Sequence, residues 1–171
     1  MVAGRAAGFV GSGQCIVEDP VAVEAVDTRA GKITLPARPI LACRFVAILA
    51  AWLKEVVSPV ADSLLGSPVD AVVTGPGHQC RQRPGGRLSE HAIGNAVDIS
   101  QFRLVDGRSI LVARLAGAEG AERVFLRAIS ASACGYFTTV LGPGSDPDHS
   151  GHLHIDLAER RLAEFRICMI R

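Results

Sequence analysis

Two short segments carry the residues whose types and spacing could bind a metal ion. Residues 89–99 read SEHAIGNAVDI, and residues 152–154 read HLH. The chain has 5 histidines, and four of them lie in or beside these segments: His91, His149, His152 and His154. Imidazole and carboxylate groups are common ligands of a catalytic zinc ion, which takes three of them and keeps one position open. The clustering therefore indicates a metal site.

The first segment must bend before its donors can reach one ion. On a continuous helix, His91 and Asp98 would lie about 10 Å apart along the axis, which is too far. Gly94 and Asn95 interrupt the segment, so we expect His91 on a turn and Asp98 on the strand that follows. On that strand the small Ala96 shares a face with Asp98 and would leave room for an ion.

The second segment is typical of a strand. His152 and His154 are two residues apart, so both side chains leave the same face of a strand. If this strand pairs with residues 96–100, the imidazoles and the carboxylate of Asp98 meet. Each element alone is weak evidence for a metal site, and the joint pattern is much stronger.

The rest of the chain predicts a mixture of helices and strands. Apolar residues recur at helical spacing over 42–57 and 119–133, and Pro59 is expected to kink or restart the first helix before Gly66 ends it. Short runs predict strands at 21–26, 33–35, 69–74, 95–100, 136–141 and 152–157, with a hairpin turn at 106–107. No regular βαβ rhythm is present, so the predicted class is α+β. We expect residues 1–14 to be poorly ordered and residues 15–171 to form one compact domain.

Composition excludes several classes of partner. The formal net charge is +1, and no basic stripe of the kind that binds nucleic acid is present. Arg81, Arg83 and Arg87 form the nearest approach to one, in a loop that is either a solvated basic turn or a carboxylate-binding loop. No apolar run approaches the roughly 18 residues that span a bilayer, so no transmembrane segment is predicted. The sequence leaves the oligomeric state open.

The cysteines point to an oxidising compartment. The 5 cysteines are scattered without a C-x-x-C pair, which argues against a zinc ribbon or a thioredoxin motif. They suit disulfides with at least one thiol left over, although small buried apolar residues are the alternative. We therefore expect a periplasmic or extracytoplasmic bacterial protein, although no continuous apolar stretch of an export signal is visible near residue 1.

The pattern S-x-H-x-x-G-x-A-x-D-I followed by H-x-H resembles the zinc signature of the D-Ala-D-Ala carboxypeptidase superfamily, which includes peptidoglycan peptidases and hedgehog-like domains. Within it, the chain most resembles the bacterial extensin-like C-terminal domain family. The matching stretches cover most of residues 40–157: 43–44, 52–59, 66–69, 80–81, 87–91, 95–99, 104–110, 125–128, 133–134, 140–143 and 152–156. The resemblance implies a hedgehog/DD-peptidase-like fold, a small antiparallel sheet flanked by helices.

The resemblance also implies roles for single residues. The implied zinc ligands are His91, Asp98 and His154. The implied substrate-binding residues are Arg81 and Ser89, near a carboxylate of the peptide, and an arginine suits such a group because it can bind it bidentately.

Catalysis would need a group that takes a proton from the attacking water. The resemblance puts His152 beside that water or the oxyanion, and its ordinary pKa near neutrality makes it the first candidate for the base. Asp148 is the second candidate. Asp156 either orients a zinc ligand from behind or is a surface carboxylate.

One departure from the pattern bears on activity. Related sequences usually carry an acidic residue just before H-x-H, where this chain has Gly151. Three functions therefore stay open. The chain is a zinc-dependent carboxypeptidase or endopeptidase acting on peptidoglycan stem peptides, a catalytically silent zinc domain that binds cell-wall peptides or another protein, or a metal-free domain whose histidines are satisfied by hydrogen bonds.

Overall fold

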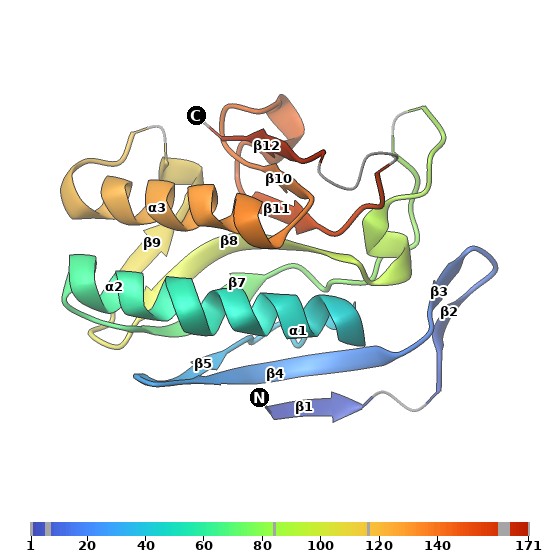
Figure 1. Ribbon diagram of the computed structural model, residues 1–171, viewed down its shortest axis with the longest axis horizontal. Coiled ribbons are helices and arrows are strands. Elements are labelled where there is room, and N and C mark those ends of the chain that lie inside the picture. Colours follow the sequence, from blue (N-terminus) through green and yellow to red (C-terminus); the bar gives the residue numbers. More distant parts are fainter. Residues whose placement is uncertain (1, 6–7, 84, 116, 161–164, 171) are drawn as a thin grey trace.

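The computed structural model describes the chain except residues 1, 6–7, 84, 116, 161–164 and 171 (Figure 1). The α-helices of the described part are α1 (Cys43–Trp52), α2 (Ser58–Leu65) and α3 (Gly120–Tyr136). Its strands are β1 (Val2–Arg5), β2 (Val10–Ser12), β3 (Cys15–Val17), β4 (Pro20–Thr28), β5 (Gly31–Thr34), β6 (Ile40–Ala42), β7 (Val69–Thr74), β8 (Ala96–Leu104), β9 (Ser109–Leu111), β10 (Thr139–Leu141), β11 (Leu153–Asp156) and β12 (Ile167–Met169).

One sheet of ten strands organises the described residues. Its order is β1-β4-β5-β7-β8-β11-β10-β12, with β6 beside β4 and β9 beside β8. Neighbours are antiparallel except β5–β7 and β10–β12, which are parallel. The mixture of helices and strands in one compact unit confirms the predicted α+β class. The sheet is larger than the small antiparallel one we expected, because β1 and β12 extend it at its two edges.

The N-terminal segment carries strands in its described residues. Although we expected residues 1–14 to be poorly ordered, β1 pairs with β4, and β2 forms a separate hairpin with β3. The glycine- and alanine-rich composition hides these strands, because their side chains show little of the alternation on which a strand prediction depends.

The first helical region continues past Pro59 and ends at Gly66, as predicted. Residues 53–57 form a π-helical turn that joins α1 to α2 without a break. Pro59 has no N–H to donate to the carbonyl four residues before it, and its ring crowds that carbonyl, so the wider turn relieves the conflict. Gly66 then ends α2 in the left-handed conformation, with φ of 67°, as predicted.

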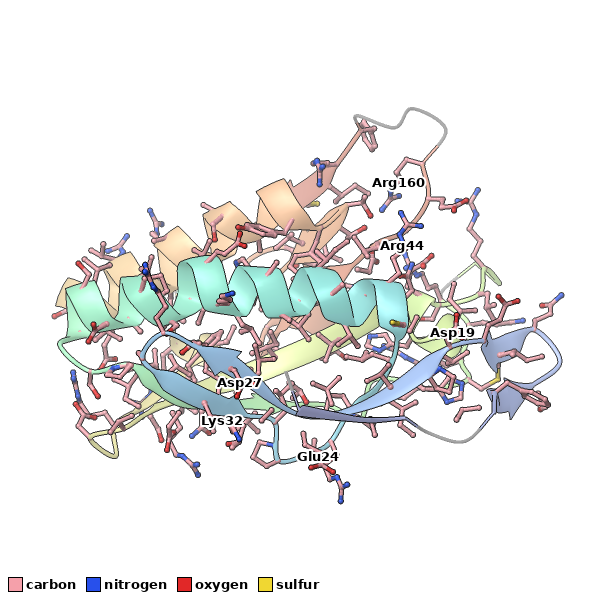
Figure 2. The ribbon with its side chains drawn as sticks, turned by 60° about the horizontal axis from the view of Figure 1, so that its bottom comes forward. Asp19, Glu24, Asp27, Lys32, Arg44 and Arg160 are labelled. Atoms are coloured by element: carbon pink, nitrogen blue, oxygen red, sulfur yellow. A yellow bond between two sulfur atoms is a disulfide. The ribbon has the colours of Figure 1, made fainter. Side chains whose placement is uncertain are left out.

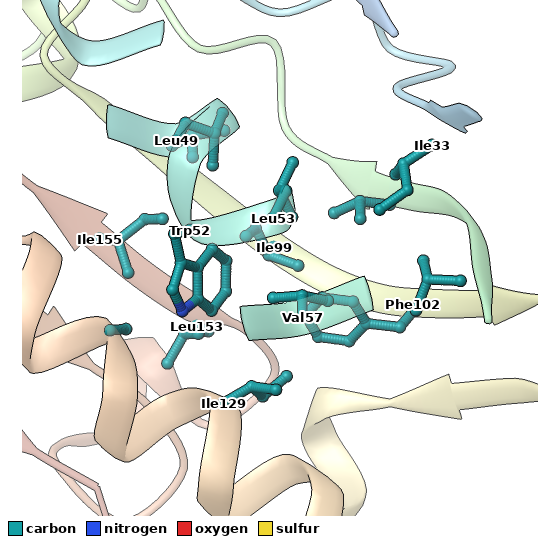
Figure 3. Close-up of a cluster of buried hydrophobic side chains, with 14 of the residues drawn as sticks. Ile33, Leu49, Trp52, Leu53, Val57, Ile99, Phe102, Ile129, Leu153 and Ile155 are labelled. Carbon is teal, nitrogen blue, oxygen red and sulfur yellow. The ribbon is translucent and has the colours of Figure 1, made fainter. Parts of the chain in front are cut away.

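The core lies between the helices and one face of the sheet. Figure 3 shows Trp52 beside Leu153 and Ile155, and all three side chains are almost completely buried. Val97 and Ile99 of β8 belong to the same core. Because side chains alternate along a strand, the residues between them face away from the helices. That opposite face carries the predicted metal-binding residues.

Two disulfides confirm the interpretation of the scattered cysteines. Cys15 bonds to Cys80, and Cys134 bonds to Cys168. The first joins β3 to the loop that precedes residues 89–99, and the second joins α3 to β12. Cys43 is free and exposed at the start of α1.

Charged side chains in and beside the β4–β5 hairpin form ion pairs on the surface. Asp27 lies 4.0 Å from Lys32, its cross-strand partner, and Glu24 pairs with Arg38 (Figure 2). Exposed pairs of this type contribute little to stability. Among the described residues, no helix combines the length and the apolar character needed to cross a membrane.

Candidate metal centre

His91 lies on a short 3-10 turn, as the interrupted segment predicts. The turn spans Glu90–Ile93, and the hydroxyl of Ser89 caps it by accepting a hydrogen bond from the His91 backbone N–H at 3.4 Å. Gly94 ends the turn with φ of 67°, where a Cβ atom would lie 2.9 Å from the backbone nitrogen of Ala42. Only glycine combines this backbone conformation with this close approach.

The ring of His91 has one defined orientation. Its Nδ1–H donates to the carbonyl of Gly77 at 2.8 Å, since a carbonyl oxygen is only an acceptor. The other ring nitrogen, Nε2, faces His154 and Asp98. Nε2 is therefore the atom of His91 that could ligate a metal ion.

Strand pairing brings Asp98 and His154 together. In the antiparallel pair β8–β11, His154 lies directly opposite Asp98, and Asp156 lies opposite Ala96. The expected pairing of these two strands is therefore confirmed. The short side chain of Ala96 leaves space on this face, where Asp156 accepts a hydrogen bond from His154 Nε2 at 3.1 Å.

Three donor atoms form a compact triangle. His91 Nε2 lies 3.2 Å from His154 Nδ1 and 3.3 Å from Asp98 Oδ1, and the last two atoms are 2.8 Å apart. Ligand atoms at about 2.0–2.2 Å from a tetrahedral zinc ion lie about 3.3 Å from one another. The described residues thus contain a His–Asp–His group that could hold a metal ion. The carbonyl of Gly77 and the carboxylate of Asp156 hold the two rings from behind.

Burial and hydrogen bonds shift the pKa values of Asp98, His154 and His152 in different directions. Burial by itself raises the pKa of Asp98, but hydrogen bonds from His154 and His91 outweigh it and hold the pKa well below its usual range. Burial lowers the pKa of His154, but the hydrogen bonds to Asp156 and Asp98 outweigh it and raise the pKa to about 9. Burial dominates for His152 and lowers its pKa.

A cleft of about 220 Å³ opens beside the triangle. It is lined by Arg81, Arg83, Ser89, Asp98, Leu141, Asp148, His149, His152 and His154. Every residue that we predicted for substrate binding or proton transfer therefore lies on one cleft with two of the predicted metal ligands. The third ligand, His91, is nearly fully buried.

The four residues predicted for proton transfer and substrate binding differ in their exposure to solvent and in their contacts. His152 Nε2 lies 3.5 Å from Asp98 Oδ1, and its side chain is 27% exposed. Asp148 is exposed on a 3-10 turn, Pro147–His149, at the edge of the cleft. Arg81 is exposed, whereas Ser89 is buried, with its hydroxyl engaged in capping.

Asp156 is no surface carboxylate. It is completely buried and accepts hydrogen bonds from His154, from the backbone N–H of Ala158 and from Arg83. Burial raises its pKa, but the hydrogen bond from His154, with the others, outweighs this and lowers the pKa. The structure supports the first of the two readings of this residue, an orienting partner behind His154.

Sequence reasoning left the roles of two residues at this cleft open. Arg83 Nη2 lies 3.1 Å from Asp156 Oδ2, a pair 73 residues apart that no local pattern signals. His149, which we did not select, pairs with Asp146. The spacing Asp-Pro-x-His was a usable signal, because an aspartate before a proline often caps a turn that returns to it.

The comparisons with known proteins give one match. Residues 3–169 match the family model described as extensin-like protein C-terminus. No curated protein and no solved structure matches the chain.

Proposed function

The chain belongs to the extensin-like protein C-terminus family, and from the geometry of its site we propose that it is a zinc-dependent peptidase that acts on peptidoglycan stem peptides. The activity would be of the carboxypeptidase or endopeptidase type. One observation carries the proposal: the His91–Asp98–His154 triangle borders a cleft that also presents Arg81 and His152. A metal ion held by the triangle would act as a Lewis acid on a peptide carbonyl, and the guanidinium suits a carboxylate near that carbonyl. The imidazole of His152 suits the attacking water or the carbonyl oxygen.

The donor set supports zinc as the ion. Two imidazole nitrogens and one carboxylate oxygen are ligands that zinc takes in catalytic sites. The two distances from His91 Nε2, 3.2 and 3.3 Å, are close to those of a tetrahedral arrangement, and the distance between His154 Nδ1 and Asp98 Oδ1, 2.8 Å, is shorter. The outer ring nitrogens of His91 and His154 lie at hydrogen-bond distance from the Gly77 carbonyl and the Asp156 carboxylate, which orients the inner nitrogens toward the site of the ion. A bound zinc ion supplies polarisation of the scissile carbonyl and activation of water at neutral pH.

The other residues of the cleft would bind and orient the peptide. Arg81 would hold a carboxylate of the stem peptide, and Arg83, paired with Asp156, lines the same cleft. Ser89 would act mainly by fixing the turn that carries His91, since its hydroxyl is used there. His152 would contact the attacking water or the oxygen of the scissile carbonyl, and Asp148 lies at the rim.

An extracytoplasmic site of action is consistent with this substrate. Two disulfides, Cys15–Cys80 and Cys134–Cys168, are compatible with an oxidising compartment such as the periplasm. Peptidoglycan lies in that compartment, so substrate and protein would meet there.

A second candidate is a catalytically silent zinc domain that binds cell-wall peptides or another protein. The observation in its favour is Gly151, which provides no side chain just before the H-x-H segment. A Cβ atom at this position would meet nothing within 4 Å, so Gly151→Asp is sterically permitted. If a missing carboxylate limits turnover, this variant should release peptide faster at unchanged zinc content. An unchanged rate would count against that explanation.

Metal analysis tests the proposal first. Purified protein should contain about one zinc ion per chain, and His91→Ala or Asp98→Ala should lose it. Asp70→Ala is the matched control, because Asp70 is a strand aspartate that pairs with Arg103 on the surface. A protein without zinc would favour a domain in which hydrogen bonds alone satisfy the histidines.

Peptide release from isolated sacculi tests the activity. Release that stops on zinc removal, resumes on zinc addition and fails in His152→Ala would support the peptidase. A zinc-loaded protein that binds sacculi and releases nothing would support the silent domain instead.

A further inference from the structure

A second histidine–carboxylate pair lies in the cleft, outside the metal group. Nδ1 of His149 lies 2.6 and 2.7 Å from the two carboxylate oxygens of Asp146. Because an ionised carboxylate only accepts hydrogen bonds, Nδ1 carries the hydrogen of this contact, and Nε2 takes no part in it. The pair thus fixes the orientation of the ring, and Nε2 is the nitrogen left to exchange a proton with another group.

Four consecutive residues build this pair. Asp146 caps the 3-10 turn Pro147–His149 by accepting the backbone N–H of His149 at 3.1 Å, and Pro147 begins the turn. The same carboxylate therefore holds both the backbone and the ring of His149. Burial raises the pKa of Asp146, but the hydrogen bond of His149 outweighs it and lowers the pKa, so the carboxylate stays ionised.

His149 lies close to the metal group without belonging to it. Its ring centroid is 5.5 Å from that of His154 and 5.3 Å from that of His152. Its side chain is 21% exposed and lines the same cleft as Asp98. Among the described residues, the group able to ligate a metal consists of His91, Asp98 and His154. His149 thus lies next to one residue of the metal group and is not itself a member of that group.

The other two candidate proton acceptors, Asp148 and His152, lack the orienting carboxylate that His149 has in Asp146. Asp148 is exposed to water at the rim, and within the described part of the chain its side chain has no hydrogen bond comparable to that between Asp146 and His149. His152 already faces Asp98, with Nε2 at 3.5 Å from Oδ1. A carboxylate partner behind the ring, which orients an imidazole and stabilises its protonated form, belongs to His149 alone among these three.

We propose that His149, oriented by Asp146, accepts the proton of the attacking water in the peptidase reaction and returns it to the leaving amine. This inference rests on the proposed function. In the first half, a bond forms between the water oxygen and the peptide carbonyl carbon while one water proton moves to His149 Nε2. In the second half, the carbon–nitrogen bond breaks and Nε2 gives that proton to the amine nitrogen. His149 thus ends the cycle in the protonation state in which it began, and Asp146 remains ionised as a positioning residue.

Turnover and zinc content, measured together, test the proposal. Using zinc-loaded full-length protein and a stem peptide, His149→Ala should lower kcat by about 10²–10⁴-fold, the usual contribution of a general base. KM and zinc content should stay as in the unmodified chain. Ser150→Ala is the matched control, because Ser150 is exposed on the same loop and its hydroxyl bonds only to the carbonyl of Pro147 among the contacts of the described residues.

Two further measurements separate chemistry from structure. Added imidazole should restore part of the turnover of His149→Ala and none of that of His91→Ala, which lacks the ion. Asp146→Asn should lower kcat less than His149→Ala and leave KM unchanged, because it removes the orientation of the ring and keeps the ring itself.

The outcomes also separate this inference from the proposed function. An active unmodified protein together with an equally active His149→Ala variant would overturn the inference alone. So would a His149→Ala variant that loses zinc in proportion to its activity, since His149 would then support the metal group. A zinc-loaded unmodified protein that cleaves no stem peptide would overturn both.

Discussion

Asp156 accepts a hydrogen bond from His154 on the side of the ring opposite Asp98. Its Oδ2 lies 3.1 Å from His154 Nε2, while Nδ1 of the same ring faces Asp98 Oδ1 at 2.8 Å. Arg83 reaches the same Oδ2 atom at 3.1 Å. One imidazole is therefore held between two carboxylates, and a cleft arginine is linked to it through the buried one.

Asp156→Asn should weaken zinc binding without removing it. An amide is a poorer acceptor for His154 Nε2–H, so the ring is less firmly oriented and its inner nitrogen is a weaker ligand. Loss of such a partner usually lowers metal affinity by about 10–100-fold. Competition with a chelator of known affinity measures the change, with Asp70→Asn as the surface control. Equal affinities in the two variants would contradict the orienting role of Asp156.

The disulfide Cys15–Cys80 should matter for the metal centre, whereas Cys134–Cys168 should not. Cys80 follows the segment that supplies the Gly77 carbonyl to His91 and precedes Arg81. Removing this disulfide takes away a restraint on that segment, so zinc affinity should fall. Arg81 and Arg83 should also be held less firmly at the cleft. The expected loss is smaller than that of His91→Ala, since the ligands themselves remain.

The second disulfide provides the control. The two disulfides close loops with separations of 65 and 34 residues, so loop-closure entropy predicts a similar loss of about 4 kcal/mol in unfolding free energy for each. Denaturant unfolding and zinc titration of the two double Cys→Ser variants should show similar destabilisation and a difference in zinc affinity alone. Equal zinc affinities would show that Cys15–Cys80 does not support the centre.

Much of the metal centre was predictable from local patterns. Alternation along a strand predicts that Asp98 faces one way and Ile99 the other, and the structure pairs Asp98 with His154 as expected. The helix breaker Gly94 predicts the turn at His91. These features depend on residues within a few positions of one another, so the sequence carries them directly.

The rest of the site depends on contacts between distant segments. The ion pair of Arg83 with Asp156 joins residues 73 positions apart, and the acceptor for His91 Nδ1 is a backbone carbonyl, which has no side-chain signature. The edge strand β12 pairs in parallel with β10, and its position follows from tertiary packing and not from its short apolar run. Sequence patterns contain no information on such pairings.

Ser89→Ala separates two roles for a residue that we expected to contact substrate. The hydroxyl accepts the His91 backbone N–H at 3.4 Å, and the side chain is almost completely buried. Loss of a capping hydroxyl should lower the unfolding free energy by about 1 kcal/mol and weaken zinc binding through the displaced turn. KM for the stem peptide, measured at saturating zinc, should change little. A large increase in KM at unchanged stability would instead assign Ser89 to the substrate.

Gly94 and Gly66 form a matched pair that isolates the effect of space from the effect of backbone conformation. Both have φ of 67°, so alanine at either position adopts the left-handed region at a cost of about 1–2 kcal/mol. A Cβ atom at Gly66 meets nothing within 4 Å, whereas at Gly94 it would lie 2.9 Å from the backbone nitrogen of Ala42 and 2.9 Å from Val17 Cγ1. Gly94→Ala should therefore destabilise the protein by more than Gly66→Ala in denaturant unfolding.

The same pair tests how tightly the turn at His91 is coupled to the metal. The atoms that crowd Gly94 belong to backbone and to the packed side chain of Val17, so the turn itself must shift to make room. Gly94→Ala should then lower zinc affinity, because His91 lies three residues before it, and Gly66→Ala should leave zinc affinity unchanged. Equal stability losses and equal zinc affinities in the two variants would mean that the turn tolerates a side chain, and that the close approach at Gly94 does not position His91.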